Sequence, residues 1–169
     1  MFYVYCLSKL MVKVDCRSRL AATSVPLSIL EGSEDESRKD VIPLLCSIFL
    51  ANQGAGDAAG EGNVVSWNDE AAVLQGEKEA EKMIVEAYSA LVLAFLSTES
   101  KSIRDSIADC LPNRNLVILV PVLERFVAQT LVYTVMKAKS NCICALHLSD
   151  MCALSRFLLY NIRYLPSRL

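Results

Sequence analysis

The densest group of potential metal ligands lies near the end of the chain, in the stretch CICALHLSDMC. Its members are Cys142, Cys144, His147 and Cys152. Four such ligands could hold zinc tetrahedrally. However, the spacing lacks the two-residue gap that is usual in structural zinc sites, and the residues between the ligands are apolar. We therefore expect packed thiols or an unstructured tail here, and we assign no metal ligand.

Catalytic residues are equally hard to assign. His147 is the only histidine, so a Ser or Cys nucleophile that needs a histidine base would have to use it. The motifs GxSxG and HExxH are absent. The stretch GAGDAAG, Gly54 to Gly60, resembles a dinucleotide fingerprint but is one residue too long. A phosphate loop also opens into a helix, which the following GEGNVVSW does not favour. We expect a glycine-rich loop over residues 53–66, no cofactor and no enzyme activity.

The seven cysteines make an odd number, and most lie among apolar residues, as in LLCSIFL. They are Cys6, Cys16, Cys46, Cys110, Cys142, Cys144 and Cys152. This pattern indicates small buried side chains in a reducing compartment rather than a disulfide framework. The opening MFYVYCLSKLM is a poor signal peptide, because no basic residue precedes its short apolar stretch.

Charge is spread unevenly, although the net value is only −2. Residues 31–86 sum to −9 and residues 128–169 to +4. A nucleic-acid binder would carry a coherent basic face, so we expect no direct contact with nucleic acid. The acidic middle is compatible with a basic partner, or simply with a solvated face and acidic loops.

Two apolar runs raise the question of a membrane. In Met83–Leu96, 12 of 14 residues are apolar, but a spanning helix needs about 20. The second run, residues 115–139, has Glu124 and Arg125 near its centre, each costing about 2.5–3.5 kcal/mol in a bilayer. Both runs therefore favour buried helices and no membrane. A small membrane-associated protein that uses residues 116–160 is kept as an alternative.

The first half of the chain predicts two helices. Residues 8–22 have basic residues along one side, and Pro26 ends that helix. The acidic stretch EGSEDESRKD follows, so that residues 1–36 form one N-terminal helix and a linker. The next helix covers VIPLLCSIFLAN, with Ser37 as its expected N-cap and Gly54 as its end.

A long helix is predicted from Asn68 to about Ser97, because this stretch is rich in strong helix formers. Its first half contains the charged EKEAEK, in which residues three apart lie on neighbouring surface. From Met83 the helix is apolar on nearly every side and should be covered on nearly every side. Trp67, just before it, is either a contact at the helix start or an exposed anchor for a partner.

A shorter helix follows, with apolar residues at helical spacing: Ile103, Ile107, Cys110 and Leu111. Pro112 stops it, and Asn115 caps the last helix, in which Pro121 marks either a kink or the first turn. No convincing alternation predicts a strand. The fold class is therefore all-α, a HEAT-like array of antiparallel helices, although no clean internal repeat is visible.

Three segments also carry a family resemblance: SRKDVIPLLCSIFLANQGAG, EAAVLQGEKEAEKMIVEAYSALVLAFLSTES and IRDSIADCLPNRNLVILVPVLERFV. Together, over residues 37–127, they resemble the C-terminal part of wings apart-like proteins, the plant members in particular. The opening residues and residues 128–169 do not resemble the family, and the latter are expected to be a divergent apolar tail. We therefore expect a truncated part of a longer helical domain.

The resemblance implies a non-enzymatic protein that promotes release of cohesin from chromatin and so regulates sister-chromatid cohesion. It implies protein partners, namely cohesin core subunits and a HEAT-repeat cohesin-associated subunit. It also implies a nuclear, chromatin-associated location. No family motif maps partner contacts onto particular residues of this chain. A truncated helical scaffold without retained activity is kept as a second alternative.

Overall fold

The computed structural model describes residues 14–26, 38–54 and 70–138, together with Leu158, Tyr160 and Ile162. This part of the chain is predominantly helical, as the sequence predicts. Its α-helices are α2 (Val14–Ala21), α4 (Val41–Asn52), α6 (Glu70–Ser97), α7 (Lys101–Cys110) and α8 (Val120–Ala138). Two short 3-10 turns, η1 (Pro112–Arg114) and η2 (Leu116–Leu119), lead from α7 into α8.

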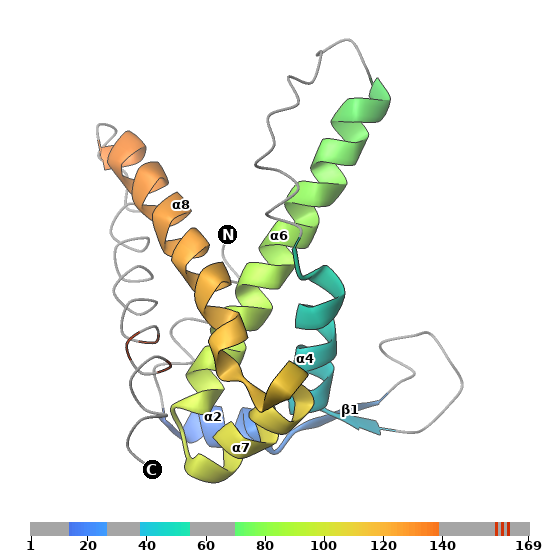
Figure 1. The fold of residues 1–169 in the computed structure, drawn as a ribbon, viewed down its shortest axis with the longest axis vertical. Coiled ribbons are helices and arrows are strands. Elements are labelled where there is room, and N and C mark those ends of the chain that lie inside the picture. Colours follow the sequence, from blue (N-terminus) through green and yellow to red (C-terminus); the bar gives the residue numbers. More distant parts are fainter. Residues whose placement is uncertain are drawn as a thin grey trace.

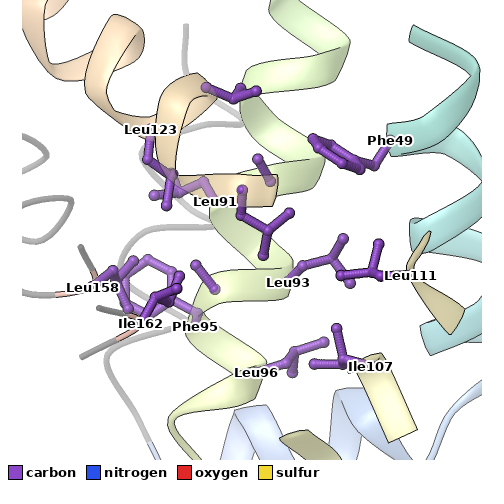
Figure 2. Packing of buried hydrophobic residues seen from close by; sticks show 14 of the residues in the cluster. Phe49, Leu91, Leu93, Phe95, Leu96, Ile107, Leu111, Leu123, Leu158 and Ile162 are labelled. Atoms are coloured by element: carbon purple, nitrogen blue, oxygen red, sulfur yellow. The ribbon is translucent and has the colours of Figure 1, made fainter. Parts of the chain in front are cut away.

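The core forms around the second half of α6, which contacts α2, α4, α7 and α8 (Figure 1). Figure 2 shows Leu93 pointing toward Leu111 and Leu96 toward Ile107, while Phe95 points the other way. The expectation of a central helix covered by its neighbours is confirmed for this half. Most fully buried side chains are aliphatic, so burial of apolar surface is the main stabilising term.

Two residues of the expected tail join this core. Leu158 is fully buried and Ile162 nearly so, and both lie beside Phe95 in Figure 2. Helix α8 also continues beyond Val127 to Ala138. The region after residue 127 therefore contributes at least one helix end and two core side chains to the described fold.

The starts of the helices agree with the sequence in part. Ser100, which was not an expected cap, caps α7, because its Oγ accepts a hydrogen bond from the Ile103 N–H. Asn115 Oδ1 accepts one from the Val117 N–H, as expected of a cap, although a 3-10 turn comes first. Pro121 is the second residue of α8, so it lies in the first turn, where its missing N–H costs little.

Two expectations at the start of α4 are wrong. The N-cap position is Asp40, without a side-chain hydrogen bond, because Arg38–Asp40 is extended and forms strand β2. β2 pairs antiparallel with β1 (Ser24–Pro26), whereas the sequence predicts no strand. Arg38 reinforces the pair, since its guanidinium donates to Ser24 Oγ at 2.9 Å and to the Ser24 carbonyl at 2.8 Å. Three residues are too few to show the alternation that identifies strands.

Candidate interaction surface

The sequence-predicted chemical motifs fall mostly outside the described residues. Cys142, Cys144, His147 and Cys152 all lie there, as does Trp67. Within residues 14–26, 38–54 and 70–138, His, Cys, Asp and Glu side chains form no group of three that could hold a metal ion. In the same part of the chain, no helix combines the length and hydropathy that crossing a membrane requires.

Gly54, the first residue of the glycine motif, is described and has a structural role. It follows α4 with φ +84°, a conformation that glycine adopts without strain. Its N–H donates to Glu86 Oε1 at 3.0 Å. A phosphate loop would present such an N–H to the ligand at the start of a helix. Here the N–H lies after the end of a helix and is already bonded to a carboxylate.

Glu86 is the centre of a polar lock between three helices, which we define as Gly54, Glu86 and Arg125. The Glu86 side chain is 1% exposed, and its Oε2 accepts a hydrogen bond from Arg125 Nη2 at 2.7 Å. Gly54 follows α4, Glu86 belongs to α6 and Arg125 to α8. The lock therefore joins α4 and α8 to α6 through one buried carboxylate, whose charge is compensated by Arg125.

Aromatic packing lies next to the lock. The rings of Tyr88 and Phe126 meet edge to face, with centroids 6.0 Å apart, and connect α6 to α8. Burial raises the pKa of the Tyr88 phenol above its usual value. The contact holds α8 against α6 one residue along α8 from Arg125, the partner of Glu86 in the lock.

The other end of α6 binds α2 by a second polar group. Arg17 Nη1 donates to Thr98 Oγ1 at 2.9 Å, and Arg17 Nε lies 3.2 Å from Glu99 Oε2 as an ion pair without hydrogen-bond geometry. Ser18 Oγ donates to Glu99 Oε1 at 2.6 Å. These side chains hold the short helix α2 against the end of α6.

Cys46 and Cys110 are free thiols that meet where α4 contacts α7. Burial raises the pKa of Cys46 to about 12, with smaller contributions from the charge of Cys110 and a hydrogen bond to its thiol. Cys46 is therefore a neutral, unreactive core side chain at neutral pH. This agrees with the expectation that cysteines in apolar stretches are buried hydrophobes.

The middle of α6 differs from the prediction. The sequence predicts burial from Met83 onward, but Ile84 is 55% exposed and Val85 is also exposed. Burial begins at Glu86, because the polar lock lies at that level of the helix. About three turns upstream, Leu74 is 52% exposed and Val73 is exposed too. The apolar sequence of α6 therefore continues well beyond the core that covers it.

These side chains share one side of the helix. At 100° per residue, the members of what we call the acidic–apolar face fall within an arc of about 120°: Val73, Leu74, Glu77, Glu81, Ile84 and Val85. The pairs 73/74 and 84/85 are eleven residues apart, which is three helical turns. This spacing can be found in the sequence. It was not interpreted as one surface, because Ile84 and Val85 were expected to be buried.

Comparison with known proteins gives one clear relationship. No family model and no solved structure matches the chain. Two curated proteins from Arabidopsis thaliana match over 112 residues, or 66% of this chain: Wings apart-like protein 1 at 67% identity and Wings apart-like protein 2 at 65%. The match spans only 12% and 13% of their lengths. Over about two thirds of its length, the chain is therefore closely similar to a small, C-terminal part of the plant wings apart-like proteins.

Proposed function

We propose that this chain is a non-enzymatic interaction protein that takes part in the release of cohesin from chromatin in the nucleus. The observation that carries the proposal is the identity of 67% with Wings apart-like protein 1 over 112 residues. Identity at that level over several helices preserves surface as well as core. The expected partners are cohesin core subunits and a HEAT-repeat cohesin-associated subunit.

The physical character of the chain supports this assignment. The described residues form a helical array held by a buried carboxylate and a continuous apolar cluster, which suits presentation of a fixed surface. Helical arrays of this kind bind other proteins along their exposed helix faces. The acidic–apolar face of α6 is one such surface.

The test is a pull-down from plant nuclear extract with the tagged 169-residue chain, in which cohesin subunits are quantified by mass spectrometry. A variant with Leu96→Asp serves as a control, because a carboxylate at this fully buried position should unfold the helical layer. We expect cohesin subunits to be enriched by the native chain and not by the variant. Equal recovery with both would mean adhesion of unfolded chain and would refute the proposal.

A second candidate, an inert helical scaffold, is favoured by the small share of the relatives' length that the chain spans. The two candidates differ in a release assay. The chain is added to permeabilised nuclei, and the cohesin that remains on chromatin is measured by immunoblot. A release factor lowers that amount relative to Leu96→Asp, whereas an inert scaffold leaves it unchanged.

A further inference from the structure

The acidic–apolar face lies on a part of α6 that projects from the helical array. Figure 1 shows this end of α6 extending past α4, while α8 diverges from it. Between Ala71 and Val85, most of the described side chains are exposed. A projecting helix of about four turns is only marginally stable by itself in water. The exposed apolar side chains of this part of α6 bury no surface in the core. Core packing therefore does not explain why they lie on one side of the helix.

The face has the dimensions of a helix-docking ridge. From Val73 to Val85 it runs along about 18 Å of helix, at 1.5 Å per residue. Its apolar side chains lie in two pairs, Val73 with Leu74 and Ile84 with Val85, separated by three turns. A partner helix with apolar residues at i, i+3 or i+4, i+7 and i+11 follows such a ridge over the same length.

Charge decides which partner fits. Glu77 and Glu81 lie between the two apolar pairs, and neither makes an ion pair or side-chain hydrogen bond with the described part of the chain. A partner that covers the ridge would desolvate both carboxylates, which costs free energy unless cations compensate them. Lys78 only borders the face, and Lys82 lies further round the helix.

This requirement argues against a second copy of the chain. Two such faces packed together would place Glu77 and Glu81 of one copy against the same carboxylates of the other. Like charges brought together and desolvated oppose association. An acidic or uncharged partner would likewise leave both carboxylates without compensation.

We propose that the acidic–apolar face of α6 is a docking site for a basic amphipathic helix of another protein. The apolar stripe of that helix covers the Val73–Leu74 and Ile84–Val85 pairs, and its Lys or Arg side chains pair with Glu77 and Glu81. The inference rests on this surface alone and does not depend on whether the partner belongs to the cohesin complex.

The test uses the full 169-residue chain and two labelled model peptides of 18 residues with the same leucine stripe. One peptide carries lysines beside the stripe and the other carries glutamates. Fluorescence anisotropy should show the lysine peptide binding at least about tenfold more tightly, with an affinity that falls as salt rises. Equal affinities for the two peptides would overturn the proposal.

Matched variants locate the site. Ile84→Ser should weaken binding of the lysine peptide about tenfold, as expected for a residue that anchors an interface. Val117→Ser, at an exposed apolar position outside α6, should change it less than twofold. Glu81→Lys should weaken binding several-fold, whereas Asp105→Lys on α7 should not, apart from the small loss that any added positive charge causes.

Circular dichroism checks that the four variants keep the native helical content. We expect them to do so, because all four positions are exposed or solvated. If Ile84→Ser and Val117→Ser weaken binding equally, the peptide binds without using the face and the proposal fails. Analytical ultracentrifugation gives a further check. A dimer that Ile84→Ser dissociates would assign the face to a second copy and would also overturn the proposal.

Discussion

Replacement of Glu86 by glutamine removes the charge at the centre of the polar lock while it keeps the size of the side chain. In the native chain, the two carboxylate oxygens accept hydrogen bonds from the Gly54 N–H at 3.0 Å and from Arg125 Nη2 at 2.7 Å. A glutamine has one acceptor oxygen, so it can satisfy only one of these donors. Its NH₂ group then faces the other donor.

The cost follows from the burial of the group. A buried donor without a partner costs about 1–3 kcal/mol. The Arg125 side chain is 26% exposed, so water can compensate part of its charge. We therefore expect Glu86→Gln to lower the free energy of unfolding by about 2 kcal/mol. Arg125→Ala should cost more, about 3–5 kcal/mol, because it leaves the 1% exposed carboxylate without a counter-charge.

Replacement of both partners tests the origin of these costs. The double variant Glu86→Leu/Arg125→Met substitutes apolar side chains of similar size and removes both charges together. Replacement of a buried ion pair in this way often leaves the free energy of unfolding unchanged or increases it. We expect the free energy of unfolding of the double variant to lie within about 1 kcal/mol of the native value, apart from the cost of the lost hydrogen bond to Gly54.

Urea denaturation followed by circular dichroism at 222 nm measures all of these free energies. The exposed pair Asp109–Arg114 provides the control, because its side chains are 52% and 75% exposed. Asp109→Asn should change stability by less than about 1 kcal/mol. If Glu86→Gln costs no more than Asp109→Asn, or if Glu86→Leu/Arg125→Met costs the sum of Glu86→Leu and Arg125→Met measured singly, the lock is not a coupled buried unit.

Four further predictions concern the other features of the fold. Gly76→Ala should increase amide-exchange protection in the first half of α6, with a gain of up to about 1 kcal/mol, because an added Cβ meets nothing within 4 Å; unchanged protection would contradict this. Iodoacetamide at pH 8 should alkylate Cys46 roughly a thousandfold more slowly in the native chain than in urea, measured by mass spectrometry, because burial raises its pKa to about 12. The native state holds that proton, and the one on Tyr88, at a pH where the unfolded chain has lost it. The contribution of these two groups to stability should therefore be constant below about pH 8.5, and thermal melts should show stability falling as pH rises from there toward 12. Glu99→Gln should weaken the contacts of Arg17 and Ser18 with Glu99, so that amide-exchange protection falls in α2 alone. A loss of protection that also reaches α4 would show that α2 is part of the core.

The helices could be predicted because their signals are local. Asn115 caps the turn that follows it, Pro121 lies in the first turn, one of its two expected roles, and Gly54 follows α4 with a positive φ. Each of these effects acts within about four residues along the chain. The apolar spacing of α7 likewise predicted its inner side, where Ile107 and Leu111 are buried.

The lock could not be predicted, because its members are far apart in sequence. Glu86 was visible only as an interruption in an apolar run, and its partners Gly54 and Arg125 are 32 and 39 residues away. The meeting of Cys46 and Cys110 depends on tertiary packing in the same way. The strands β1 and β2 were missed because three residues carry no periodicity, and their pairing depends on main-chain bonds that any sequence can make.

Glu86 also explains why hydropathy alone misplaced the edge of the core. Hydropathy treats Met83–Leu96 as one run, yet the carboxylate at its fourth position is fully inside while two apolar neighbours, Ile84 and Val85, are outside. A carboxylate is buried there only because Gly54 and Arg125 reach it, so the lock defines where α4 and α8 stop covering α6. Upstream of it, apolar residues on α6 have no contact within the core to maintain them. The exposed large apolar residues there lie on one side of α6, with Glu77 and Glu81 between them, as an interface requires and a solvated helix does not.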